Sequence, residues 1–235
     1  ATIGHVGHGG GGALDGLIEI EVLNGDILVE AGSKELFAFA QIGHGGWDSR
    51  NHGGGIDVTA ALGDITIRGG NAGTYNHAKI GHGGYGNGSV QIDTGAITVE
   101  ATAGAVELNS RNGTYGYTQI GHGGMGKNSY MRGEFHDAIT VTGGKGVTLG
   151  AGSRADTFAM IGHGGTSVRG IFTGAVNVTA GADGLVMTGG SNSRAFAQLG
   201  HGGYNEAGAT GVYTISAAPV TVTAGLVDLR GGTAT

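Results

Sequence analysis

Short apolar runs alternate with polar residues along the whole chain, with a period of two. In the stretch 56–60 (Ile-Asp-Val-Thr-Ala), the first, third and fifth residues are apolar and the two between them are polar. This alternation is typical of β-strands that bury one face, and no segment sustains the 3.6-residue spacing of an amphipathic helix. The sequence therefore predicts an all-β protein.

The predicted strands recur in a fixed order. A first strand ends at a histidine, a second and a third follow it, and glycine-rich turns separate them. The first strands are 39–44, 77–82, 117–122, 158–163 and 196–201. The second strands are 18–22, 56–60, 97–101, 139–142, 176–180 and 220–224. The third strands are 27–29, 65–67, 106–108, 147–149, 185–187 and 227–229. A weaker fourth strand is predicted before the second, at 90–92 and 212–215.

Each first strand leads into the tetrapeptide Gly-His-Gly-Gly. Its histidines are His44, His82, His122, His163 and His201, at intervals of 38, 40, 41 and 38 residues, and a sixth copy lies at 7–10. An active site is not written five times at a near-constant period, whereas a stacked repeat is. The connection after each tetrapeptide varies in length and content, as a surface loop does.

A repeat of this kind predicts a parallel β-helix, or β-solenoid, rather than a sandwich or a closed barrel. We expect about six repeats forming one continuous array over residues 1–235, with a right-handed winding. Coils about 4.8 Å apart would give a rod of roughly 29 Å if each repeat forms one coil. If the fourth strand forms throughout, two coils per repeat and a rod of twice that length are the alternative.

The composition narrows the functional classes. Glycine accounts for 55 of the 235 residues without a Gly-X-Y period, and this excludes collagen. The net charge of −6 with 12 Lys and Arg argues against nucleic acid and against anionic membrane surfaces. There is no cysteine and no run of about 18 apolar residues, so neither a disulfide framework nor a membrane-spanning helix is expected. A chain that begins at Ala1 without a Met is interpreted as a processed part of something longer.

The histidines lie in phase with the core. Period two places Ala40, Ile42 and His44 on one face of the first strand and Gln41 on the other, so His44 points inward near a corner. The outward, solvent-facing positions of the other repeats are predicted to be Lys79, Gln119, Met160 and Gln198. A column of neutral, hydrogen-bonded imidazoles that tightens the stack is favoured over a column of metal sites or a proton wire, because no carboxylate recurs beside the histidine.

Three aromatic residues follow the tetrapeptide directly: Trp47, Tyr85 and Tyr204. We predict that they are exposed and could contact a carbohydrate or another ligand, although Met125 and Thr166 interrupt the row. Outward Thr-x-Thr pairs on the second strands resemble those of ice-binding solenoids, but only two of five rows are complete. Acidic residues do not pair at a recurring place, so no catalytic dyad is visible, and we expect neither an enzyme nor a cofactor.

The repeats resemble those of large secreted bacterial exoproteins of the filamentous-haemagglutinin type. The resemblance rests on Ala-Gln-Ile-Gly-His-Gly-Gly at 40–46, Gly-Asp-Ile-Thr-Ile-Arg-Gly-Gly at 63–70 and Ile-Thr-Val-Glu-Ala at 97–101. It implies a parallel β-helix, export to the bacterial cell surface, and an adhesive or biofilm-matrix role. The secretion domain at that family's N-terminus is not visible here.

Together these observations predict a structural protein: an extracellular fibre or cell-surface adhesin that associates head-to-tail or forms part of a longer rod. The alternative function is a module that binds carbohydrate or another ligand through the variable loops. Matrix or host-surface glycans are therefore candidate partners, and a metal-binding or ice-binding solenoid is a weaker candidate.

Overall fold

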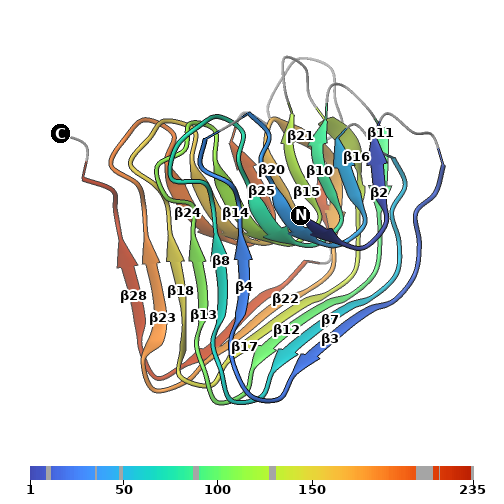
Figure 1. The fold of residues 1–235 in the computed structure, drawn as a ribbon. Coiled ribbons are helices and arrows are strands. Elements are labelled where there is room, and N and C mark those ends of the chain that lie inside the picture. The colour runs from blue at the N-terminus through green and yellow to red at the C-terminus, as the bar shows by residue number, and fades with distance from the viewer. Residues whose placement is uncertain are drawn as a thin grey trace.

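The structure is a computed structural model that describes residues 1–8, 12–34, 36–47, 50–86, 90–126, 131–204, 214–216 and 218–233; the side chains of residues 6–8, 47 and 90 lie outside this description. Every regular element in these ranges is a β-strand, which confirms the all-β prediction. The chain winds into a β-solenoid in which equivalent strands of successive coils lie side by side (Figure 1). No helix in the described ranges is long and apolar enough to cross a membrane.

The strands form five parallel sheets, named here sheets A to E in the order in which the chain visits them from the first strand. Sheet A contains β1 (Thr2–Ile3), β5 (Ala40–Ile42), β9 (Ala78–Ile80), β14 (Tyr117–Ile120), β19 (Phe158–Ile161) and β24 (Phe196–Leu199). Sheet B contains β2 (Val6–His8), β6 (Gly45–Trp47), β10 (Gly83–Gly86), β15 (Gly123–Gly126), β20 (Gly164–Thr166) and β25 (Gly202–Tyr204). Sheet C contains β11 (Val90–Asp93), β16 (Met131–Phe135), β21 (Val168–Thr173) and β26 (Thr214–Ser216).

The remaining two sheets carry the predicted second and third strands. Sheet D contains β3 (Ile18–Val22), β7 (Ile56–Ala60), β12 (Ile97–Ala101), β17 (Ile139–Gly143), β22 (Val176–Ala180) and β27 (Val220–Ala224). Sheet E contains β4 (Ile27–Glu30), β8 (Ile65–Arg68), β13 (Val106–Asn109), β18 (Gly146–Gly150), β23 (Gly184–Thr188) and β28 (Val227–Arg230). The fourth strand is thus present, as sheet C.

Each repeat forms one coil. In sheet D, β7 pairs with β12 so that Ile56 lies beside Ile97, and β12 pairs with β17 so that Ile97 lies beside Ile139. Each step moves one repeat along the chain and one strand along the sheet. The fourth strand therefore enlarges the coil, and the alternative of two coils per repeat is wrong.

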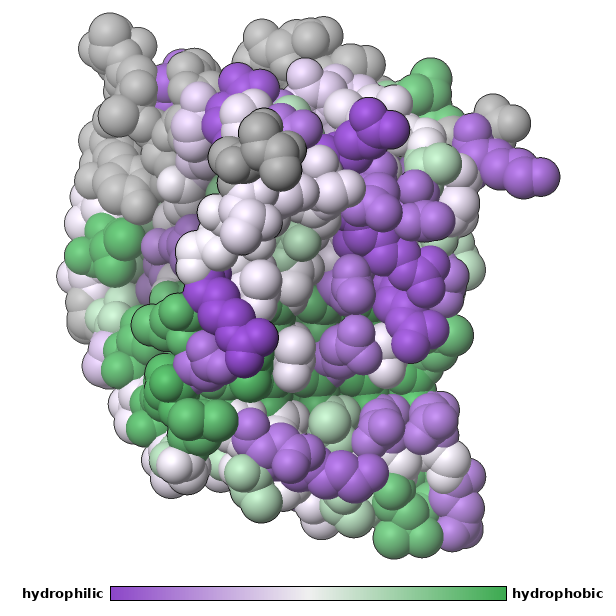
Figure 2. All heavy atoms as spheres, turned by 90° about the vertical axis from the view of Figure 1, so that its left-hand side faces the viewer, coloured by the Kyte–Doolittle hydropathy of each residue, from purple (hydrophilic) through white to green (hydrophobic). Residues whose placement is uncertain are grey.

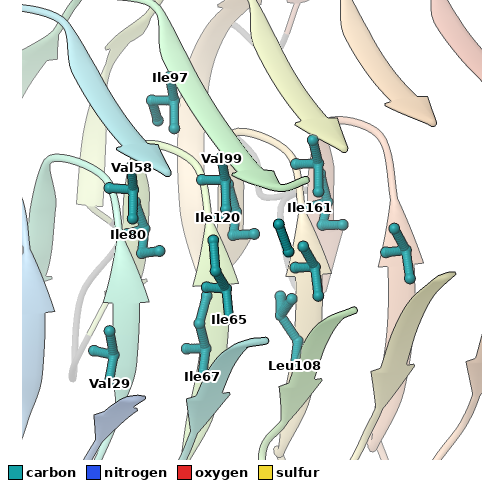
Figure 3. Close-up of a cluster of buried hydrophobic side chains, with 14 of the residues drawn as sticks. Val29, Val58, Ile65, Ile67, Ile80, Ile97, Val99, Leu108, Ile120 and Ile161 are labelled. Carbon is teal, nitrogen blue, oxygen red and sulfur yellow. The ribbon is translucent and has the colours of Figure 1, made fainter. Parts of the chain in front are cut away.

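The main core lies between sheets A, D and E. Val58 and Val99 of sheet D, Ile65 and Leu108 of sheet E, and Ile120 of sheet A all point into it (Figure 3). Their exposure is zero, and burying a side chain of this size contributes about 1.5–3 kcal/mol. The alternation of buried and exposed positions along β7 follows the predicted period of two.

The other face of sheet A is also buried, so the prediction that this face meets solvent is wrong. Lys79, Gln119 and Met160 have no solvent exposure, and Gln198 of the last coil is half-buried. The reason is that the glycine-rich stretch after each histidine is a strand of sheet B, where a surface loop was predicted. Side chains of this strand, such as Tyr85 and Met125, pack with Tyr117 and Phe158 of sheet A in a second apolar cluster. A third cluster is formed by Met131, Phe135, Val168 and Phe172 of sheet C.

Candidate functional site

The predicted histidines form a single column at the corner between sheets A and B. The imidazole rings of successive coils stack nearly parallel, with centroids 4.8–4.9 Å apart and interplanar angles of 2–9°. The column contains His5, His44, His82, His122, His163 and His201. The spacing equals the distance between neighbouring strands, so the backbone ladder itself sets the ring stack.

Five of the six column histidines, those from His44 to His201, use both ring nitrogens. Nδ1 of His82 accepts the backbone N–H of His44 in the preceding coil at 2.9 Å, and Nε2 of His82 lies 2.8 Å from the carbonyl oxygen of Gly54. A carbonyl can only accept, so Nε2 carries the proton and Nδ1 does not. The same two contacts recur at His44, His122, His163 and His201. The geometry therefore requires neutral imidazoles of one tautomer.

The first ring of the column belongs to His5, so the copy predicted at residues 7–10 is out of register. His5 stacks on His44, whereas His8 lies on β2 opposite Trp47. The sequence held the necessary signal, because Ile3-Gly4-His5 repeats Ile42-Gly43-His44. Val6 occupies the place of Gly45, and this substitution hid the match.

Glycine before each histidine makes the corner. Gly121 has a φ of +147°, and a Cβ added there would lie 2.0 Å from the carbonyl oxygen of Gly162 in the next coil. A side chain is excluded by both the backbone conformation and the close approach of the neighbouring coil. Gly43, Gly81 and Gly162 share this geometry, with φ of +146° to +153° and contacts of 2.0–2.1 Å.

Burial makes protonation of the column costly. It lowers the pKa of His82 to about 4 and that of His163 to about 3, and it holds the pKa of His122 well below its usual value. Protonation would also place an N–H on Nδ1, against the backbone N–H that this nitrogen accepts. The described residues contain no group of three His, Cys, Asp or Glu side chains arranged to hold a metal ion.

A second polar column fills the inside of the same corner. The side-chain amide of Gln41 donates to the carbonyls of His44 in its own coil and of Gly81 and Gly83 in the next, at 3.0–3.2 Å. Gln119 makes the equivalent three bonds. These side chains satisfy carbonyl groups that the glycine corner leaves inside the protein.

In one coil the glutamine is replaced by Lys79. Its ammonium donates to the carbonyls of His82 at 2.6 Å and of Gly123 at 2.8 Å, and it is completely buried. Burial lowers its pKa to about 7, and the nearby carboxylate of Asp93 opposes this shift. Asp93 in turn lies 2.5 Å from Nδ1 of His52, with both side chains fully buried.

His52, Lys79 and Asp93 form a cluster of residues that depart from the repeat, so the repeat pattern did not predict it. Asp93 lies in register with Phe135, which is followed by Phe172, so the next two coils are apolar at this position. A buried charge is tolerated only with partners: Asp93 is hydrogen-bonded to His52, and its carboxylate offsets the burial of the Lys79 ammonium, which itself bonds backbone carbonyls. Their complete burial keeps them away from any molecule in solution.

Two further aromatic columns were not predicted. One stacks Phe39, His77, Tyr117, Phe158 and Phe196, with centroids 4.5–5.3 Å apart. The other stacks Phe37, Tyr75 and Tyr115, each with φ between +53° and +61°. Its next two positions are Asp156 and Arg194, which share the positive φ and form an ion pair at 2.6 Å. The recurrence of Phe, His or Tyr five residues before the column histidine was the available signal.

The three predicted ligand-contacting aromatics do not share one environment. Tyr85 is only 2% exposed and packs among Phe37 and Tyr75, so the prediction that it is exposed is wrong. Tyr204 is 39% exposed, with the guanidinium of Arg194 over its ring at 5.6 Å from the centroid. The side chain of Trp47 lies outside the described residues.

Comparisons with known proteins add no family to this picture. No protein-family model matches the chain, and no curated protein or solved structure matches it either. Of the properties that the filamentous-haemagglutinin resemblance implies, the structure shows the β-solenoid fold.

Proposed function

We propose that the chain is a section of a structural β-solenoid rod that belongs to an extracellular fibre or cell-surface adhesin of a bacterium. The observation that carries this proposal is the continuity of the ladders: sheets A, B, D and E each have six strands in register, and the column of six histidines crosses the same coils. In a scaffold each coil has to hold the next in register. Here hydrogen bonds from the backbone and from buried polar side chains both connect successive coils.

The polar interior supports a scaffold over a catalyst. The imidazoles and glutamines bond backbone carbonyls and N–H groups of neighbouring coils, and each such bond contributes about 0.5–1.5 kcal/mol net. The cluster formed by His52, Lys79 and Asp93, which does not follow the repeat, is closed to solvent. Location outside the cell is supported by the filamentous-haemagglutinin resemblance of the repeats.

The ligand-binding alternative has less support. With Tyr85 buried, the aromatic residues after the tetrapeptide do not form one exposed row along the rod. Binding of matrix or host-surface glycans stays a prediction, and a glycan array with the purified chain checks it.

Immunogold electron microscopy tests the proposed function. Antibodies raised against the purified chain should label fibres or the outer surface of the producing cells, while cells lacking the gene should stay unlabelled. Label confined to the cell interior would refute the extracellular scaffold.

A further inference from the structure

A hollow of about 580 Å³ lies on the side of the solenoid, at the corner where the chain turns from sheet E to sheet A. Its lining comes from the ends of β13, β18, β23 and β28 and the turns that follow them, so it crosses four successive coils, about 14 Å along the rod axis. These turns lie at the upper left of Figure 1, and hydrophilic residues gather on this side of the solenoid at the upper right of Figure 2. Three of the four coils have a neighbouring coil on each side, so the hollow belongs to the lateral wall of the rod. Its volume is typical of ligand sites in proteins.

The hollow exists because large side chains are missing from successive coils. Asn109 of β13 lies beside Gly150 of β18. Two residues further along the chain, Arg111 is followed in the next two coils by Gly152 and Gly190. The asparagine and the arginine therefore form a rim, and the glycines beside them form a depression.

Polar groups with unused hydrogen-bonding capacity line this depression. Thr188 and Ser191 are both half-buried, and neither hydroxyl has a hydrogen-bond partner among the described residues. The side-chain oxygen of Asn109 accepts the backbone N–H of Arg111 at 3.0 Å, while its amide nitrogen has no partner in the described part of the chain. A hydroxyl both donates and accepts, and an amide nitrogen donates. The hollow therefore offers donors and acceptors to a ligand.

A chain of hydrogen bonds fixes the polar row along the same corner. The backbone N–H of Asn71 donates to Oγ of Ser33 at 3.0 Å. Oδ1 of Asn112 accepts the backbone N–H and the hydroxyl of Ser153 at 3.1 and 2.6 Å, and Nδ2 of Asn112 lies 3.4 Å from Oδ1 of Asn71. Side chains that are already held in place lose little freedom when a ligand binds. Because these bonds connect successive coils, the polar row repeats along the rod axis.

The lining is nearly balanced in charge and carries little apolar surface. Arg111 donates to the carboxylate of Glu30 at 2.8 Å, and Arg230 pairs with Asp228. A lining whose arginines are already paired gives little attraction to a polyanion such as a nucleic acid. Ala151 is the only apolar side chain among the described residues that line the hollow, so a peptide would find no pocket for an apolar anchor.

From these features we infer that the hollow binds an uncharged polysaccharide that lies along the rod axis. A polysaccharide presents hydroxyl groups that both donate and accept, and these match the hydroxyls and amides of the lining. Its repeating units can follow a polar row that itself repeats from coil to coil. The site lies at a different corner from the aromatic residues after the tetrapeptide, and it goes beyond the proposed scaffold function.

A glycan array probed with the fluorescently labelled chain tests this inference. The array carries linear oligosaccharides of glucose and of N-acetylglucosamine as uncharged probes, and oligosaccharides of galacturonic acid as charged probes. We expect at least one uncharged probe to bind. Its dissociation constant, measured by calorimetry, should change less than about twofold between about 50 and 500 mM salt, because no charged groups have to be brought together.

Two pairs of variants locate the binding. Ser191→Leu fills the hollow and should weaken binding by at least about tenfold, whereas Ser193→Leu lies in the same turn outside the lining and should leave it unchanged. Thr188→Val removes one hydroxyl at nearly constant shape and should weaken binding about two- to tenfold. Thr148→Val, on the same face of sheet E but outside the hollow, should have no such effect.

Circular dichroism verifies that each variant is folded. Binding of the charged probes alone, no binding of any uncharged probe, or equal affinities of Ser191→Leu and Ser193→Leu would overturn the inference. None of these outcomes changes the immunogold labelling, so the failure of this site and the failure of the scaffold function are distinguishable.

Discussion

The substitution His77→Phe isolates the effect of a buried imidazole on stability. His77 lies in an aromatic column between Phe39 and Tyr117, with ring centroids at 5.2 and 4.5 Å. The equivalent positions 39, 158 and 196 are phenylalanine, so a phenylalanine ring fits this column. The change removes one titratable group and is expected to preserve the fold.

The magnitude follows from the pKa of the buried ring. Burial, aided by the charge of Lys79, lowers the pKa of His77 from 6.5 to about 3. The unfolded chain therefore binds this proton as the pH falls below 6.5, while the folded chain does not until about pH 3, and stability is lost in that window. At pH 4.5, two units below the unfolded pKa, the loss is about 2.7 kcal/mol for this residue alone. The phenylalanine variant should not show this loss of stability.

Urea unfolding followed by circular dichroism, at pH 7.5 and pH 4.5, measures the difference. The free energy of unfolding of His77→Phe relative to the unmodified chain should rise by about 2.7 kcal/mol between the two pH values. His136→Asn is the control substitution at a histidine outside the aromatic column, with a side chain that is 29% exposed. If the difference in unfolding free energy between the phenylalanine variant and the unmodified chain is the same at both pH values, the buried neutral imidazole does not cause the loss of stability at low pH.

Two further predictions concern the corner. Gly121→Ala forces a Cβ to within 2.0 Å of a backbone oxygen at positive φ and should cost at least about 2 kcal/mol in urea unfolding; Gly225→Ala, where nothing lies within 4 Å, should cost less than about 1 kcal/mol. Lys79, whose pKa burial lowers from 10.5 to about 7, should make the folded state about 2.5 kcal/mol more stable at pH 9.5 than at pH 7.5, because in that window the unfolded chain still binds the lysine proton and the folded chain does not, so raising the pH disfavours the unfolded state. Lys79→Gln, which restores the residue found at 41 and 119, should abolish this rise, and a rise that persists would contradict the assignment.

The repeat itself was predictable because ladder positions recur at one period. Alternation along Ile56–Ala60 identified the face that packs in the core, and the recurrence of Gly-His-Gly-Gly indicated a coil corner. A parallel in-register stack requires similar residues at equivalent positions, and this requirement is visible in the sequence without any coordinates.

The surroundings of sheet A were not predictable in the same way. Period two correctly separated Ile80 from Lys79, but it says only that the two side chains point to opposite faces. Whether the second face meets water depends on where sheets B and C lie, and stretches such as Gly83–Gly86 carry no alternation that marks them as strands. Glycine-rich strands lack side chains to pattern, so their pairing is seen only in the assembled coil.

The sequence by itself determined that the chain is an all-β solenoid with a histidine at one corner of each coil. The tertiary structure alone decided that His5 begins the column, that Lys79 and Tyr85 are buried, and that His52 and Asp93 meet. These outcomes depend on contacts between residues that are distant along the chain or hidden by a substitution such as Val6 for glycine. The repeat period reveals the residues that all coils share. The environment of a residue that departs from the repeat is seen only in the folded structure, because it depends on neighbours in other coils.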